Sequence, residues 1–427
     1  VPEGAVLLRR RLARAHERAG RPEFGVASAE GECGAGDARV FTLSNGVYGV
    51  QCTDSGLFRS SAGGVSVYRG FESPAGPAGL RFEFLDGEGR AAELRPLPAS
   101  EGGLRFKYRL RGGLLRFDGS RADGFACSLT TGVTASDMAE VRIVELSAPG
   151  GLDGALRLSF EPVLARAEDF EAHPAFWRLG LHAEVREGAL LIRRLPRQKL
   201  ASCWLCLASD APLEYRADAS GEALGWLAHP LVTACAPVRT EPGGVFRARF
   251  ALAFAATERE ALDSARRALS CGAGKLADLP SALGALYGAD AAARGLPELA
   301  ARLCFPRVEG GGTARGALWA LGVPGDFPII CARVSKDGED AARAAIARHA
   351  ILRCCGVRSE LVFLTGDGGE YHRDAARAVS RALSAAGLEA LYAARAGVYC
   401  VGADAEGAVE RSAAVVLDAR GEPLPSK

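Results

Sequence analysis

Apolar and polar residues alternate in short runs along the first half of the chain. Between Leu156 and Phe160, for example, apolar residues occupy every second position, which is typical of a strand with one buried face. Such runs, separated by Gly, Pro, Ser and Asp, recur at Val40–Leu43, Val47–Cys52, Val65–Tyr68, Leu80–Phe84, Leu104–Leu110, Leu114–Phe117, Phe125–Thr130, Leu179–Val185, Ala189–Arg193, Ala201–Ala208, Val232–Pro237 and Val245–Phe254. They predict a large antiparallel sandwich, because an antiparallel sheet buries its apolar face against another layer.

The spacing of apolar residues changes from a two-residue to a helical period at Thr257. Thr257 and Glu260 have the spacing of a helix-capping pair, and apolar residues then recur at helical spacing. Further helices and a Gly-rich linker are predicted at Leu279–Tyr287, Leu296–Leu303 and Val308–Thr313.

The last part of the chain alternates between strands and helices. Strands are predicted at Pro328–Val334, Glu360–Thr365, Leu388–Tyr392, Gly397–Val401 and Ala414–Leu417, and helices at Glu339–Cys355, Tyr371–Ala386 and Glu406–Ser412. Apolar strands that alternate with helices indicate a small parallel sheet. We therefore expect a multidomain β plus α/β protein with an N-terminal helical arm (1–23), a large β-sandwich domain (24–256), a helical linker (257–313) and a small α/β domain (314–427).

Composition limits the classes of partner. Of the 427 residues 48% are hydrophobic and 24% charged, which indicates globular domains. A net charge of +1 gives no reason to expect nucleic acid as a partner, and no apolar run is long enough for direct membrane insertion. Because the chain starts at Val1 and its single methionine is Met138, we expect a segment of a longer polypeptide.

The twelve cysteines are irregularly spaced. A disulfide scaffold would be short and loop-rich, so reduced thiols and a cytoplasmic location are expected. Cys203 and Cys206 have the spacing of half a zinc site, but no second pair of ligands lies at a matching distance. No metal and no cofactor are therefore predicted.

Four segments match sequence motifs of a known family and occur in the same order. They are Leu43–Tyr48, Ala139–Ser147, His173–Glu184 and Leu318–Ile330. In this order they resemble the β-supersandwich region of glycoside hydrolase family 94, most closely that of cyclic β-1,2-glucan synthases and β-1,2-oligoglucan phosphorylases. The resemblance implies a mutarotase-like β-supersandwich followed by a small α/β segment.

The resemblance also implies a function. The family's catalytic (α/α)₆ barrel would need about a dozen helices, which this chain lacks. We expect a non-catalytic carbohydrate-binding or structural portion of a cyclic β-1,2-glucan synthase-like (glycosyltransferase) or family 94 glycoside phosphorylase-like protein. Its partners would be β-glucan or another oligosaccharide and the catalytic domain of the same or a partner polypeptide. The alternatives are a purely structural module and a free-standing mutarotase-like sugar epimerase, in which His182 and Glu184 would supply acid/base catalysis.

Aromatic and basic residues suggest where a sugar could bind. Sugar C–H faces stack on aromatic rings, while His and Arg donate to hydroxyls. The predicted carbohydrate-binding residues are Arg59, His173, Phe176, Trp177 and Trp226. The competing interpretation is that Phe176 packs in the core and His173 caps a loop. A core position is also open for Trp177, Trp204 and Trp226. Pro324 and Ala320 depart from the family pattern, so glucan contacts at that motif would be weakened.

Overall fold

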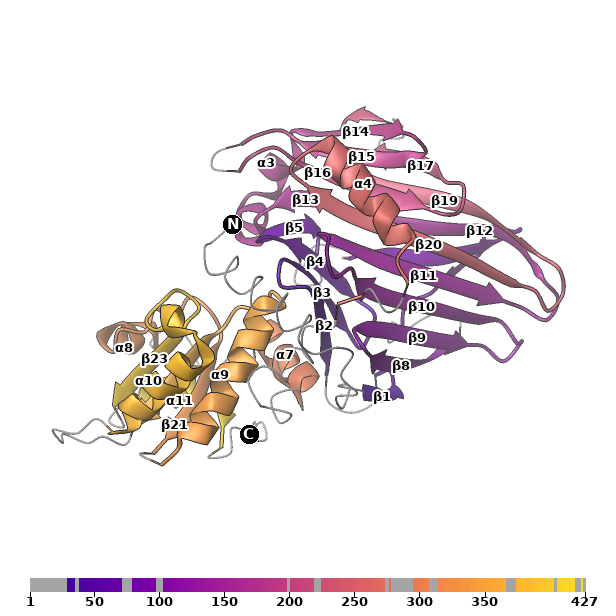
Figure 1. The fold of residues 1–427 in the computed structure, drawn as a ribbon. Helices are drawn as coiled ribbons and strands as arrows, with labels where there is room; N and C mark the ends of the chain where they lie inside the picture. Colours follow the sequence, from indigo (N-terminus) through magenta and orange to yellow (C-terminus); the bar gives the residue numbers. More distant parts are fainter. Residues whose placement is uncertain are drawn as a thin grey trace. The chain divides into compact units, whose positions relative to one another are not determined.

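The computed structural model describes residues 29–34, 38–70, 79–96, 103–197, 200–218, 224–272, 276–277, 295–306, 314–335, 337–365, 374–402, 405–418 and 424 (Figure 1). The chain divides into two compact units, formed mostly by Leu43–Asp278 and Leu279–Lys427. The expected fold class is confirmed, since the first unit consists of large antiparallel sheets and the second contains a small parallel sheet. The predicted arm at 1–23 and the predicted helix at Leu279–Tyr287 lie outside the described residues.

A ten-stranded antiparallel sheet dominates the first unit. Its order is β1-β8-β9-β10-β11-β20-β16-β15-β14-β18. The strands are β1 (Ala29–Glu32), β8 (Arg105–Arg111), β9 (Leu114–Ser120), β10 (Ala126–Val133), β11 (Ala139–Ser147), β20 (Val245–Ala255), β16 (Cys203–Ser209), β15 (Ala189–Arg194), β14 (Leu181–Arg186) and β18 (Gly225–Trp226).

Two five-stranded sheets cover one face of this large sheet. The first is ordered β17 (Glu214–Asp218), β19 (Pro230–Thr240), β12 (Leu152–Phe160), β6 (Arg81–Asp86) and β7 (Ala91–Glu93), and the second β13 (Pro162–Ala165), β5 (Val65–Tyr68), β4 (Phe58–Ala62), β3 (Tyr48–Thr53) and β2 (Val40–Ser44). Phe82 meets Phe250 with ring centroids 5.3 Å apart, and Phe58 meets Phe117 at 6.5 Å. These inter-sheet aromatic contacts form the sandwich core that the period-2 pattern predicts.

An ion pair lies inside that core. Glu140 and Arg142 on β11 are both fully buried and bond to each other. The Tyr48 hydroxyl donates to Glu140 at 3.2 Å, and Arg142 donates to Thr131 at 2.7 Å and lies 4.0 Å from the Phe58 ring centre. Buried charges of this kind require such partners, so the two sheets are held in one relative position by polar as well as apolar contacts.

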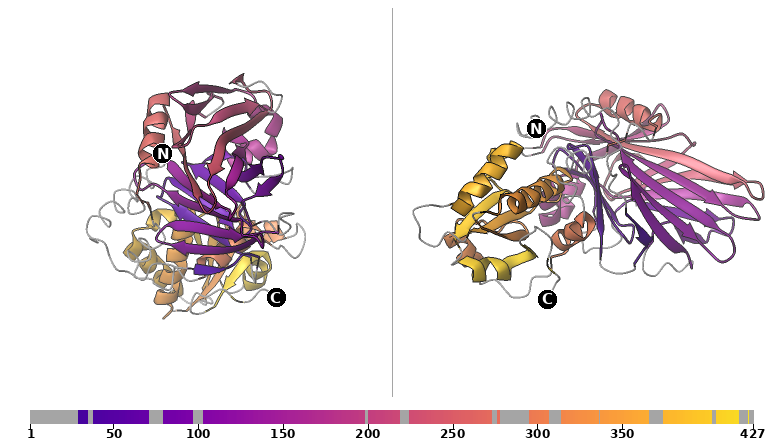
Figure 2. Two further views of the ribbon diagram at one scale, coloured as in Figure 1. Left: turned by 90° about the vertical axis from the view of Figure 1, so that its right-hand side faces the viewer. Right: turned by 60° about the horizontal axis from the view of Figure 1, so that its bottom comes forward.

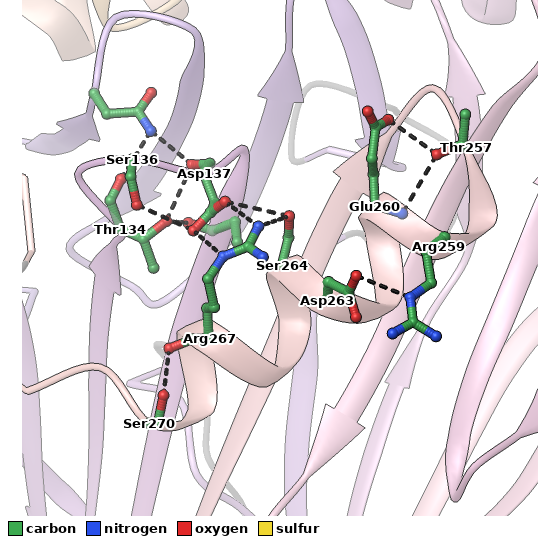
Figure 3. Close-up of polar contacts among 12 residues, drawn as sticks. Thr134, Ser136, Asp137, Thr257, Arg259, Glu260, Asp263, Ser264, Arg267 and Ser270 are labelled. Carbon is green, nitrogen blue, oxygen red and sulfur yellow. Dashed lines mark hydrogen bonds and ion pairs between the residues drawn. The ribbon is translucent and has the colours of Figure 1, made fainter.

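The opposite face of the large sheet carries helix α4 (Glu258–Leu269), as all three views show (Figures 1 and 2). Thr257 accepts a bond from the Glu260 backbone N–H, so the predicted helix cap is present. Arg267 donates to Asp137 at 2.7 Å, and Ser264 donates to the same carboxylate at 3.3 Å (Figure 3). The sequence places α4 in a linker, whereas the structure packs its Ala-rich face on β11, β20 and β16.

The second unit is a four-stranded parallel sheet ordered β23-β22-β21-β24. Alternate strand residues face opposite layers, with α8 and α11 on one side and α9 and α10 on the other. Its elements are α7 (Leu296–Cys304), α8 (Ala314–Ala320), β21 (Ile329–Val334), α9 (Glu339–Cys354), β22 (Glu360–Thr365), α10 (Asp374–Ala386), the 3₁₀ turn η2 (Glu389–Leu391), β23 (Val398–Gly402), α11 (Glu406–Ser412) and β24 (Ala413–Leu417).

One predicted strand of this unit is wrong. The Leu388–Tyr392 segment contains the 3₁₀ turn η2. Gly387 ends α10 in a left-handed conformation (φ 63°), and Leu388 N–H bonds back to Leu383 C=O at 2.9 Å. Such an ending leads the chain directly into a tight turn, so these apolar residues do not extend.

Candidate functional site

Four side chains form a row at one edge of the large sheet. The strand register pairs Trp226 with His182, His182 with Arg193, and Arg193 with Trp204. Residues directly opposite each other in an antiparallel sheet point to the same face. The row, which we call the edge row, crosses β18, β14, β15 and β16 and spans roughly 14 Å at the usual strand spacing.

The side chains of the edge row contact one another. The His182 ring meets the Trp226 ring edge to face with centroids 5.0 Å apart. The Arg193 guanidinium lies 5.5 Å from the Trp204 ring centre, and its Nε donates to Ser202 at 3.4 Å. Trp226 is 61% exposed and Arg193 is exposed, so ring surface and N–H donors remain available to a ligand.

Helix α4 fixes the inner end of this row. Trp204 is partly buried and packs against the cluster that includes Leu262 of α4 and Ala255 of β20. Arg186 of β14 forms an ion pair with Glu258 at 2.9 Å. The strands that carry the edge row are therefore packed against α4. This packing holds the side chains of the row in place before a ligand binds.

Trp177, predicted as a stacking platform, is a core residue. It is 3% exposed and packs with Val163, Ala165 and Phe170. Buried Arg194 donates to the Trp177 C=O at 2.6 Å and to the Leu179 C=O at 2.8 Å, and its guanidinium lies 5.7 Å from the Trp177 ring centre. Trp177 therefore packs in the core, and its ring is not exposed to a sugar.

The other predicted residues lie outside the edge row. Phe176 on α3 (Pro174–Arg178) is 38% exposed, but the Arg197 guanidinium covers its ring at 3.5 Å. His173 is exposed at the junction of α2 (Ala167–Ala172) and α3. Arg59 on β4 donates to Gln51 on the neighbouring β3. Of the five predicted residues, only Trp226 belongs to the edge row, and Arg193 was missed because nothing local distinguishes it.

The acid/base pair of the epimerase alternative is not assembled. His182 and Glu184 share a face of β14, as predicted. However, Glu184 forms its ion pair with Arg186 at 3.2 Å, and His182 packs on Trp226. No His182–Glu184 hydrogen bond occurs among the described contacts.

Metal chemistry has no support in the described part of the chain. No group of three or more His, Cys, Asp or Glu residues there could hold an ion. Cys203 and Cys206 are three apart on β16, so they point to opposite faces of the sheet. Both are buried, and burial raises the pKa of each thiol to about 12. The cysteines form no disulfide within the described residues.

The comparisons with known proteins relate part of this chain to carbohydrate-active proteins. No protein-family model matches it. A stretch of 79 residues is 34% identical to the cyclic β-(1,2)-glucan synthase NdvB of Rhizobium meliloti (strain 1021), and it covers 18% of this chain and 3% of that protein. None of the described helices is long and apolar enough to cross a membrane.

Solved structures give weaker likenesses. A protein from the human microbiome described as a kojibiose phosphorylase shares 11% identity at a TM-score of 0.38, over 73% of this chain and 48% of that one. A bacterial glucoamylase complexed with acarbose shares 11% identity at a TM-score of 0.41, over 65% and 41%. Likenesses at these scores do not establish an activity.

Proposed function

We propose that the β unit is a carbohydrate-binding module that holds a β-glucan chain along the edge row. The observation that carries this proposal is the register that aligns Trp226, His182, Arg193 and Trp204 on one face. Two aromatic rings with the N–H donors of His182 and Arg193 between them match the alternating C–H faces and hydroxyls of an oligosaccharide.

The proposal extends to the protein in which this module acts. The short likeness to a cyclic β-(1,2)-glucan synthase and the family 94 resemblance support a cyclic β-1,2-glucan synthase-like or family 94 phosphorylase-like polypeptide. In that polypeptide the module would act in carbohydrate metabolism without catalysing a reaction, beside a catalytic domain and in the cytoplasm. Linear β-1,2-glucan is therefore the first ligand to test.

The test compares tryptophans inside and outside the edge row. Trp226→Ala and Trp204→Ala are measured against Trp319→Ala, which removes a 65% exposed tryptophan of the second unit. Isothermal titration with linear β-1,2-glucan should show about fivefold weaker binding for each edge-row variant, because a stacked ring contributes about 1 kcal/mol. The control should bind like the parent chain.

Three results would each decide against part of this proposal. Parent-like affinity of both edge-row variants would show that glucan does not use the row. Absence of measurable glucan binding by the parent chain would favour the second candidate, a structural module that packs on a catalytic domain. Glucose 1-phosphate release from β-1,2-glucan and phosphate by the pure chain would overturn the non-catalytic role.

A further inference from the structure

A second polar surface lies on the same face of the large sheet, at the other end of α4. The register aligns Lys107, Asp118, Ser128, Glu145 and Arg247 across β8, β9, β10, β11 and β20. Arg249, which lies two residues after Arg247 on β20, donates to the C=O of Leu269 at the end of α4. The edge row lies beyond the start of α4, so the two surfaces are separate.

A cavity of about 1420 Å³ is lined by Lys107, Asp118, Ser128 and Glu145 of this surface, and also by Ser55 and Pro96, which flank strands of the two smaller sheets. The described residues that line it include three basic and three acidic side chains and four serines, namely Arg105, Lys107, Arg116, Glu32, Asp118, Glu145, Ser55, Ser120, Ser128 and Ser147. Its lining therefore carries no net charge and many groups that donate and accept hydrogen bonds.

Arg116 organises the acceptors of this cavity. It donates to Asp118 at 2.6 Å and to Glu145 at 3.0 Å, and Ser128 also donates to Glu145 at 3.0 Å. Burial disfavours the charged form of Glu145, but the bond from Ser128 and the charge of Arg116 outweigh it and hold its pKa below the ordinary value. Glu145 is therefore ionised at neutral pH and can accept hydrogen bonds, but it cannot act as a general acid.

The donors and acceptors of the cavity select a class of ligand. A polyanion would meet three carboxylates, and an apolar ligand would cover charged groups without giving them hydrogen-bond partners. A neutral polyol donates to carboxylates and accepts from Lys and Arg. Lys107 and Arg105, which form no ion pair within the described residues, are the available donors.

We propose that this cavity is a second carbohydrate subsite, which binds a neutral oligosaccharide through Lys107, Arg116, Asp118 and Glu145. This inference rests on the proposed glucan-binding function, but it concerns different residues. The charged groups of the cavity complement the aromatic edge row: hydrogen bonds give orientation in the cavity, and stacking gives affinity at the row.

The experiment measures binding of linear β-1,2-glucan by isothermal titration. Asp118→Asn and Lys107→Ala each remove one charged hydrogen-bonding partner, and each should weaken binding about tenfold. Asp153→Asn is the matched control, because it neutralises an exposed carboxylate that pairs with Arg239 on a different sheet. It should bind like the parent. Heparin, a polyanion, should not compete with glucan.

The outcomes separate the two proposals. Parent-like binding by Asp118→Asn and Lys107→Ala, with weaker binding by Trp226→Ala, would overturn the cavity and leave the edge row. The reverse pattern would overturn the edge row and leave the cavity. Heparin binding that Lys107→Ala abolishes, without glucan binding, would replace the neutral ligand by a polyanion. A parent chain that binds neither probe would overturn both.

Discussion

The side-chain amide of Asn45 donates to the backbone C=O of Asp137 at 2.8 Å and to that of Thr134 at the same distance. Its amide oxygen accepts from the backbone N–H groups of Val47 and Tyr48. One side chain thus joins the turn between β2 and β3 to the turn between β10 and β11.

Asn45→Ala should therefore destabilise the β unit. The variant removes one donor from each of the Thr134 and Asp137 C=O groups and one acceptor from two backbone N–H groups. We therefore expect a decrease of about 1–3 kcal/mol in the free energy of unfolding. Urea denaturation of Asn45→Ala and of Ser136→Ala, an exposed neighbour, measures the effect. Equal stability of the two variants would show that the Asn45 bonds contribute nothing.

The sequence predicts most strands of this fold because period and burial agree. In β12, Leu156, Leu158 and Phe160 are buried while Arg157 and Ser159 between them are not, so a two-residue period is sufficient to identify the strand. The edge row could not be predicted in the same way. It depends on the pairing of Trp226 with His182, which lie far apart in the chain, and no local pattern encodes that register.

Whether Trp177 lies at the surface or in the core could not be predicted from the sequence, for a related reason. A tryptophan after His-Pro-Ala-Phe is compatible with a surface corner or with a core position. Contacts with Arg194 hold Trp177 in the core. The Arg194 guanidinium donates to four backbone C=O groups, of which one belongs to Trp177 itself. Burial lowers the pKa of Arg194 to about 10, and the side chain stays charged at neutral pH.

The buried pair Glu140–Arg142 should be strongly coupled. Arg142→Met leaves an unpaired buried carboxylate and should cost about 3–5 kcal/mol, whereas Arg142→Met combined with Glu140→Gln should recover part of that loss. Urea denaturation of both variants tests this. In the exposed pair of Asp153 and Arg239, Arg239→Met should cost less than about 1 kcal/mol. Similar losses for Arg142→Met and Arg239→Met would contradict the buried network.

His349 should make the second unit sensitive to acid. It is fully buried, its Nε2 lies 3.0 Å from the Ser359 C=O, and burial lowers its pKa from 6.5 to about 4. Above pH 6.5 the ring is neutral in both the folded and unfolded states, so it has no effect on stability. As pH falls from 6.5 to 4 only the unfolded state takes up the proton, and stability decreases by up to about 3 kcal/mol.

His349→Gln isolates this effect, because glutamine keeps a hydrogen-bonding group but does not titrate. The difference in unfolding free energy between parent and variant should be constant above pH 6.5. It should shift in favour of the variant between pH 6.5 and 4, as measured by urea denaturation at several pH values. A difference that stays constant down to pH 4 would show that the imidazole is accessible to protons in the folded protein.

Truncation of Trp177 should lower stability much more than truncation of Trp226, since Trp177 is 3% exposed and Trp226 is 61% exposed. Trp177→Ala empties a packed site and should lower the free energy of unfolding by about 3–5 kcal/mol. Trp226→Ala should change it by less than about 0.5 kcal/mol while weakening binding of linear β-1,2-glucan. Melting temperature and glucan affinity of both variants provide the measurement. If Trp226→Ala lowers the melting temperature as much as Trp177→Ala does, the Trp226 ring supports the fold, and the edge row loses the exposed platform on which its glucan-binding role depends.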